Sequence, residues 1–210
     1  MNKIILLVVF YTVFAIRAYS QAVVSGNFEA GAGAGFGIFQ VSHNDSSSEN
    51  AIGVSGILQG HFNYAAIDNL SLGVLFQRNG FVTERDSGNS VQTWLPGASV
   101  HYRVINAEST TVYFGLTGGP SWIHFYHNGS KNYVDGKGYW FDLVAGTRFF
   151  ISDITGFFVE LSYNKQHFTN FYDKDNNLLM VGPVNGRREY MLNLGGMNLR
   201  LGLNFKFGKK

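Results

Sequence analysis

The stretch Met197-Asn198-Leu199-Arg200-Leu201-Gly202-Leu203-Asn204-Phe205-Lys206-Phe207 near the C-terminus decides the fold class, because every second residue in it is apolar. A period of two places successive side chains on opposite faces of an extended strand. One face of this strand carries only Met, Leu and Phe, and the other carries only Asn, Arg, Gly and Lys. The stretch therefore predicts a β-strand that separates two unlike environments.

The same alternation recurs in seven further stretches upstream, which are 28–38, 52–64, 70–77, 93–104, 112–117, 141–149 and 157–164. Tight connections at 65–69, 106–109 and 152–155 alternate with longer polar segments at 41–50, 78–90, 126–138 and 166–190. Short turns at one rim and long loops at the other are typical of an up-and-down meander. The pattern predicts an all-β, eight-stranded antiparallel barrel with both termini at the short-turn rim.

The composition excludes several other classes of protein. Charged residues make up 14% of the 210 residues and aromatics 16%, with 26 Gly and no Cys. So much Gly disfavours a helical bundle, and so many aromatics disfavour a disordered chain. The 16 basic and 14 acidic residues give no basic face for nucleic acid. Without cysteine there is no disulfide framework, no Cys-ligated zinc and no thiol chemistry.

The periodicity alone leaves open whether the apolar face lines the inside or the outside of the barrel. A soluble calyx would place it inside, but an eight-stranded barrel has an interior just wide enough to be filled by side chains. About five large apolar residues from each strand would overfill that space. We therefore expect a transmembrane barrel whose apolar face meets hydrocarbon and whose small polar face packs inward.

The inward face carries charged and titratable residues, which need partners because an unpaired buried ion is costly. These residues are Glu29, His61, His101, Arg103, Asp142, Arg148, Glu160, Arg200 and Lys206. A turn centred near residue 154 predicts an Arg148–Glu160 pair, and Glu29 is expected to pair with Arg200 or Lys206 across the closing seam. Such a network either plugs the lumen or forms the selectivity ring of a small pore.

The first twenty residues have the pattern of a secretory signal peptide. Lys3 gives a positive start, thirteen apolar residues follow from Ile4, and Ala18-Tyr19-Ser20 ends the segment. The apolar run is too short to span a bilayer comfortably as a helix. We expect residues 1–20 to be a signal peptide cleaved after Ser20, or alternatively after Ala22, and residues 21–210 to form the barrel domain.

The signal peptide, the eight amphipathic strands and the ending 199–210 together resemble the small outer-membrane β-barrels of OmpA/OmpX type. The ending, Leu199-Arg200-Leu201-Gly202-Leu203-Asn204-Phe205-Lys206-Phe207-Gly208-Lys209-Lys210, is similar to that of the "porin family" or "outer membrane protein beta-barrel domain" proteins of Bacteroidetes. The resemblance implies that Phe207, with Phe205, is the signal read by the barrel-assembly machinery. Gly208-Lys209-Lys210 after the aromatic departs from the enterobacterial habit of ending on the aromatic itself.

The resemblance implies little chemistry, and the residues indicate no catalytic, cofactor-binding or metal site. The expected function is a non-enzymatic integral protein of the cell outer membrane of a Gram-negative bacterium, with a structural or surface-contact role through long external loops. Its expected partners are outer-membrane lipids, the barrel-assembly machinery and an unidentified external ligand or host surface, without a cofactor or nucleic acid. The alternatives are a lipid A-modifying enzyme and a small pore.

Overall fold

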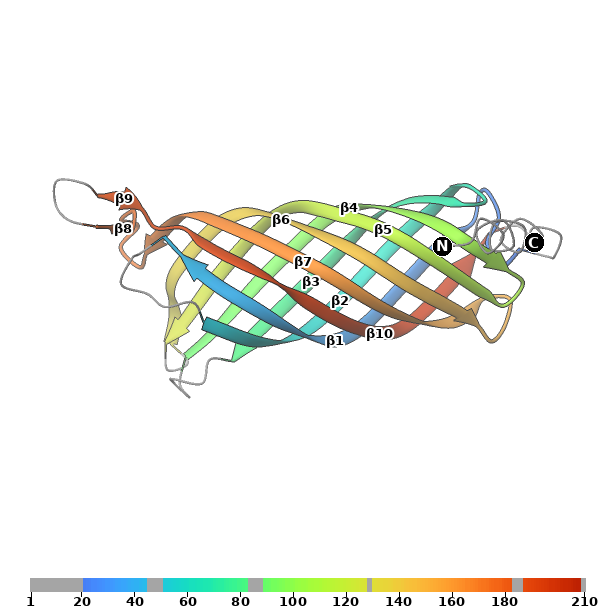
Figure 1. The fold of residues 1–210 in the computed structure, drawn as a ribbon, viewed down its shortest axis with the longest axis horizontal. Helices are drawn as coiled ribbons and strands as arrows, with labels where there is room; N and C mark the ends of the chain where they lie inside the picture. The colour runs from blue at the N-terminus through green and yellow to red at the C-terminus, as the bar shows by residue number, and fades with distance from the viewer. Residues whose placement is uncertain (1–20, 45–50, 83–88, 128–129, 183–186, 209–210) are drawn as a thin grey trace, which may run out of the picture.

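Eight long strands close into a single antiparallel barrel, as the alternation predicts (Figure 1). The computed structural model describes residues 21–44, 51–82, 89–127, 130–182 and 187–208. The barrel strands are β1 (Phe28–His43), β2 (Ala51–Ile67), β3 (Leu70–Val82), β4 (Asn89–Ala107), β5 (Thr110–His127), β6 (Ser130–Phe150), β7 (Thr155–Asp173) and β10 (Leu192–Phe207). A small hairpin of β8 (Met180–Val181) and β9 (Arg188–Glu189) stands at the long-loop end.

Each strand pairs with its neighbour in the chain, and β1 closes the ring by pairing with β10. The seam opens with Phe28 opposite Phe207, so the barrel begins and ends at the same rim. The tight connections at this rim lie between β2 and β3, between β4 and β5, and between β6 and β7. Their positions agree with the turns predicted from the sequence.

The strands are longer than the sequence pattern indicates, and this corrects the predicted loops. The third loop was expected at 126–138, but β5 continues to His127 and β6 starts at Ser130. Crossing a bilayer needs about 9–11 residues per strand, whereas these strands have 13 to 21. Alternation is imposed only where one face meets hydrocarbon, so a paired strand that continues beyond the membrane carries no such signal.

The apolar face of the barrel points outward, which confirms the predicted orientation. Leu58, Leu143 and Leu161 are 50% or more exposed, as are many Phe, Ile and Val side chains on the same face. The alternate positions are buried and mostly polar. Closing the sheet pairs the backbone groups of neighbouring strands, so this exterior presents mainly side chains to its surroundings.

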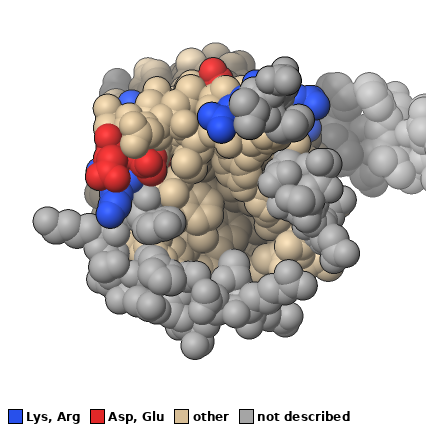
Figure 2. All heavy atoms as spheres, turned by 90° about the vertical axis from the view of Figure 1, so that its left-hand side faces the viewer, with Lys and Arg blue, Asp and Glu red and all other residues tan. Residues whose placement is uncertain are grey.

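The interior is polar near the short-turn rim but apolar near the long loops, which the sequence did not predict. A buried apolar cluster lies in the lumen at the loop end, and Val41, Phe125, Leu179 and other partly buried residues pack against it. Its buried members are Phe39, Phe81, Ile123, Phe168, Phe171, Leu192 and Leu194. Figure 2 looks into this end, where the molecule is hollowed and the described residues lining the hollow are uncharged.

The segment 21–27, before β1, covers the opposite rim. Ala22 and Val23 are buried against Ala65 and Phe150. Asn106 accepts a bond from the backbone of Val23 at 3.1 Å and donates one back at 2.6 Å. The short-turn end is therefore packed rather than open.

The described part of the chain contains no helix with the length and apolarity to span a membrane. The predicted signal peptide, residues 1–20, lies outside the described residues.

Candidate functional site: an ion network inside the barrel

Glu29 on β1 is the centre of the first ion cluster, close to the short-turn rim. Its carboxylate pairs with Arg148 of β6, with 2.7 Å between Nη1 and Oε1, and with Arg103 of β4. Arg103 also donates to the hydroxyl of Ser71 at 2.5 Å. None of the three charged side chains is more than 1% exposed. Two cations and one anion give this cluster a formal charge of +1.

Arg200 on β10 is the centre of the second cluster. It pairs with Asp142 of β6 at 2.8 Å and with Glu160 of β7 at 3.1 Å. The amide of Gln77 accepts a further bond from Arg200 at 2.7 Å, and Gln59 donates to Glu160 at 3.0 Å. One cation and two anions give this cluster a formal charge of −1, so the two clusters balance each other.

Tyr113 of β5 connects the clusters. Its hydroxyl donates to Glu160 Oε1 at 2.5 Å, while the Arg148 guanidinium lies 4.5 Å from the centre of its ring. The ring has room because Gly146 lies against it: a Cβ on Gly146 would come within 2.5 Å of the Tyr113 ring. Arg148 also lies within hydrogen-bond distance of His101, at 3.4 Å. The charged groups thus form one continuous layer across the lumen.

The structure brings six of the seven predicted charged residues together in this layer, all except Lys206, but the predicted pairs are wrong. Arg148 pairs with Glu29, not with Glu160, because the register of β6 and β7 places Phe158 opposite Arg148 and Gly146 opposite Glu160. Glu29 pairs with Arg103 and Arg148 instead of Arg200. The lumen is narrow enough for long side chains to meet across it, so the pairs join strands that are not neighbours.

Lys206 belongs to the rim and not to the ion layer. Its ammonium donates to the carbonyl oxygen of Ala22 at 2.5 Å and lies 5.0 Å from the centre of the Phe150 ring. The prediction that Lys206 pairs with Glu29 was therefore wrong. The segment 21–27 supplies an acceptor that the strand pattern did not include.

The remaining predicted residues and the residues that the prediction missed are readily placed. Phe205 and Phe207 lie on the outer face of β10 and are 37% and 50% exposed. His61 is buried and contacts Asn204 at 3.1 Å.

Three members of the network were not predicted from the sequence: Tyr113, Gln59 and Gln77. They occupy inward positions of the alternation, which is the one sequence signal that could have found them.

This layer can close the lumen, but its carboxylates are poorly placed for chemistry. Glu29, Asp142 and Glu160 are at most 2% exposed and each lies against an arginine. A substrate would have to displace these partners to reach them. Among the described residues, no group of three or more His, Asp or Glu is arranged to hold a metal ion.

Solved structures of bacterial outer-membrane proteins share this architecture. OprG from Pseudomonas aeruginosa matches with a TM-score of 0.54 and 12% identity, covering 90% of this chain and 100% of OprG. Neisserial surface protein A has a TM-score of 0.47 and 14% identity over 84% of this chain and 98% of its own. Ail of Yersinia pestis has a TM-score of 0.44 and 13% identity over 88% of this chain and 100% of its own.

No protein-family model matches the sequence, and no curated protein sequence matches it. The likeness to OprG therefore concerns the fold. This chain has the fold of a small eight-stranded outer-membrane β-barrel, as its sequence pattern predicted.

Proposed function

We propose that this chain is a non-enzymatic integral protein of the bacterial outer membrane, which anchors surface-exposed segments on a closed barrel. The observation that carries the proposal is the pairing of an apolar exterior with a lumen closed by the ion layer. The exterior suits hydrocarbon, and the arginines and carboxylates of the layer are at most 2% exposed. The outer-membrane location is supported by the likeness of the fold to OprG.

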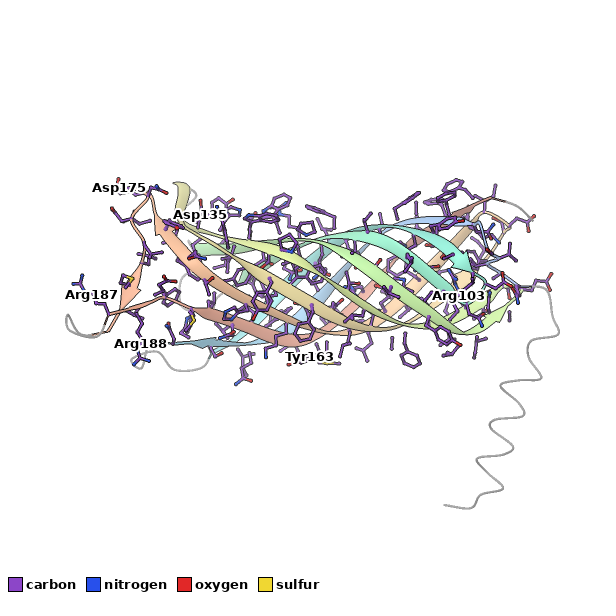
Figure 3. All side chains as sticks on the ribbon, turned by 90° about the horizontal axis from the view of Figure 1, so that it is seen from above. Arg103, Asp135, Tyr163, Asp175, Arg187 and Arg188 are labelled. Atoms are coloured by element: carbon purple, nitrogen blue, oxygen red, sulfur yellow. The ribbon has the colours of Figure 1, made fainter. Side chains whose placement is uncertain are left out.

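The long-loop end supports a role in contact with the cell exterior. The strands continue beyond the length needed to cross a bilayer, and the hairpin of β8 and β9 extends the molecule further at this end (Figure 1). The hairpin is fixed to the barrel, since Leu179 donates to the Phe171 carbonyl at 2.8 Å and Tyr190 bonds to His43. Asp175, Arg187 and Arg188 stand out from this end (Figure 3).

Trypsin added to intact cells is expected to cut the chain after Lys174, Arg187 or Arg188, because these exposed residues lie at the long-loop end. Fragment masses measured after extraction give the cut sites. The variant K174Q/R187Q/R188Q is the control and loses those cuts. Cutting at these residues only after the cells are permeabilised would place this end on the periplasmic side and contradict the proposal.

Two other activities remain alternatives with distinct outcomes. A lipid A-modifying enzyme would change the mass of lipid A incubated with the purified, refolded protein. A pore would give stepwise single-channel conductance in a planar bilayer. The interior of an eight-stranded barrel is normally filled by side chains, which leaves no path for ions. We expect neither result, because the charged groups of the lumen are buried and paired with one another.

The proposal includes export by a signal peptide over residues 1–20 and assembly directed by Phe207, with Phe205. Phe207→Ala is expected to lower the amount of heat-modifiable barrel in the outer-membrane fraction of cells several-fold, while the purified chain still refolds in detergent. Phe28→Ala is the matched control, since Phe28 lies opposite Phe207 on the same outer face. Equal amounts of the two variants and the wild type in cells would remove the assembly role.

A further inference from the structure

The hydrogen-bond ladder between β4 and β5 is interrupted in the middle of the barrel wall. Trp94 pairs with Trp122 and Ala98 pairs with Gly118, but the residues between them do not pair. Continuing the register places Pro96 opposite Pro120, and these are two of only three prolines in the chain. Proline has no N–H to give to a ladder and is normally confined to sheet edges or bulges. Two facing prolines in a closed wall are therefore an unusual feature.

The interruption is closed from the inside. The indole of Trp140 donates to the Pro96 carbonyl at 3.0 Å, and Leu75 and Leu95 pack with Trp140 beneath it. The two backbones also approach closely, because a Cβ on Gly119 would come within 2.3 Å of the Pro96 carbonyl oxygen. The prolines therefore change the shape of the outer surface. At this place the outward positions of β4 and β5 carry proline, alanine and glycine instead of large apolar side chains.

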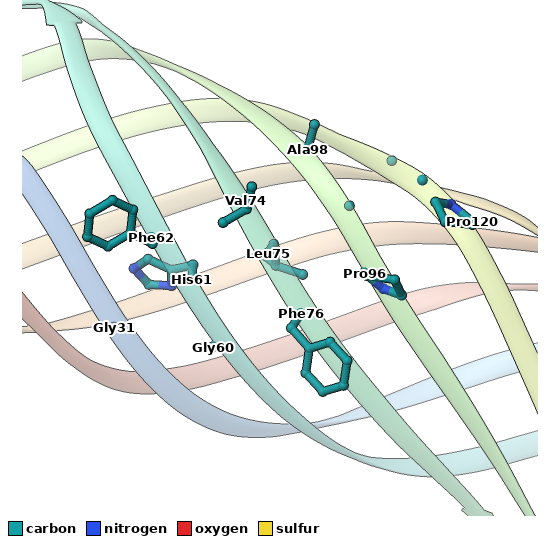
Figure 4. A pocket seen from close by; sticks show the side chains of 13 residues that line it. Gly31, Gly60, His61, Phe62, Val74, Leu75, Phe76, Pro96, Ala98 and Pro120 are labelled. Carbon is teal, nitrogen blue, oxygen red and sulfur yellow. The ribbon is translucent and has the colours of Figure 1, made fainter.

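That outer surface is hollowed into an apolar groove across β2, β3, β4 and β5 with a volume of about 790 Å³ (Figure 4). Its outward-facing walls include Phe62, Val74 and Phe76, which are 45% to 59% exposed. Its floor includes Gly60, Pro96, Ala98, Gly118 and Pro120. The groove therefore has apolar walls and a low floor, on a face that the proposed function places in hydrocarbon.

A row of two cations and two tryptophans borders this groove on the side of the long loops. The register places Arg78 beside Trp94, Trp94 beside Trp122, and Trp122 beside Lys137. All four lie two residues nearer the long loops than the residues of their strands that are in register with Pro96. The Arg78 guanidinium lies 5.0 Å from the centre of the Trp94 ring and donates to Gln92 at 2.7 Å.

We propose that this groove and row bind one phosphorylated lipid of the leaflet nearest the long loops, and the proposal rests on the membrane location argued above. An acyl chain occupies the groove over Pro96 and Pro120, and the phosphate lies between Arg78 and Lys137. Tryptophan and basic side chains at the edge of an apolar band suit the headgroup level of a bilayer.

Charge favours a phosphorylated lipid over a neutral one at this site. Among the described residues, no carboxylate forms an ion pair with Arg78 or Lys137, so both cations can face an anion. Asp135 lies two residues from Lys137 on the same face, but His124 contacts its carboxylate at 2.8 Å. A further outward lysine, Lys165 of β7, lies beside Phe141 and Gly195 and outside the row.

The test uses the full chain refolded in vesicles of phosphatidylcholine with brominated acyl chains, which quench the fluorescence of tryptophans that touch them. Trp94 and Trp122 report on the row, while Trp140, at 2% exposure, gives a constant background. Unbrominated phosphatidic acid is then titrated in and restores fluorescence if it displaces brominated lipid. We expect phosphatidic acid to be preferred roughly thirtyfold, because each of the two basic residues near the anionic headgroup contributes about 1 kcal/mol.

R78Q and K137Q are each expected to lower that preference roughly fivefold, while K165Q leaves it unchanged. Ala98→Phe fills the groove and is expected to lower the preference as well. Ala145→Phe, at an exposed outward alanine outside the groove, is its matched control. No preference in the wild type, or equal values for R78Q and K165Q or for A98F and A145F, would overturn the lipid site.

Two further measurements distinguish the lipid site from a dimer interface and from a failure of the proposed membrane barrel. A dimer in detergent that Ala98→Phe dissociates would assign the groove to a second copy of the chain and overturn the lipid site. A heat-dependent gel shift is recorded for every sample before the titration. A chain without the shift overturns the proposed membrane barrel and the lipid site together, whereas a folded barrel without the preference overturns only the lipid site.

Discussion

Glu29→Gln is expected to lower the free energy of unfolding by about 3–5 kcal/mol, because it removes one partner of a buried ion cluster. The substitution keeps the size of the side chain but leaves Arg103 and Arg148 facing each other without a counter-ion. Both are about 1% exposed, so water does not solvate their charges. The local formal charge rises from +1 to +2.

Equilibrium unfolding in guanidinium, followed by the heat-modifiable gel band of the protein in vesicles, measures this loss. Glu108→Gln, in an exposed turn, is the matched control and should change the stability by less than about 0.5 kcal/mol. The double variant Glu29→Gln/Arg148→Gln restores the local charge of +1 and is expected to recover part of the loss. A loss below about 1 kcal/mol for Glu29→Gln alone would mean that the ion layer is not what holds the lumen together.

Strand order and face could be predicted from the sequence because the membrane imposes them on every residue of the wall. The alternation of residues such as Leu201, Gly202 and Leu203 carries that constraint directly. The volume of an eight-stranded lumen then decides the face, since large apolar residues cannot all fit inside. Strand order follows from the spacing of apolar residues, and the outward face follows from the volume of the lumen. The structure agrees with both predictions.

The pairs inside the lumen could not be predicted, because they depend on register and on reach across the barrel. A shift in the assumed turn centre moves Glu160 away from Arg148. Even a correct register would not have joined Glu29 of β1 to Arg103 of β4, which are three strands apart in the wall. The apolar cluster around Phe39 was also missed, because an apolar inward residue breaks the alternation used to recognise the strand.

The groove at Pro96 and Pro120 also could not be predicted from the sequence. Each proline lies at an outward position, and in the sequence it only interrupts the apolar face of its own strand. Only the register of β4 and β5 reveals that the two face each other. The row formed by Arg78, Trp94, Trp122 and Lys137 is likewise a property of four neighbouring strands and of no single one.

The second large effect is expected from a charge placed on the outer wall. Leu143 lies on β6 between the exposed aromatics Tyr139 and Phe149 and is 52% exposed. On the lipid face of a barrel, arginine at the bilayer midplane costs about 2–4 kcal/mol, and near the interfaces about 0–1 kcal/mol. Leu143→Arg should therefore lower the free energy of unfolding by about 2–4 kcal/mol. Ile151→Arg, in the exposed turn after β6, should lower it by less than about 1 kcal/mol.

This pair of variants, unfolded by guanidinium from the same lipid vesicles, measures directly what surrounds the barrel. Hydrocarbon around the wall predicts that Leu143→Arg lowers the free energy of unfolding by at least about 2 kcal/mol relative to the wild type, and by more than Leu143→Ala does, while Ile151→Arg stays close to the wild type. Equal stabilities for Leu143→Arg and Ile151→Arg would mean that water bathes the wall at Leu143, and a membrane barrel with an apolar exterior would then be ruled out.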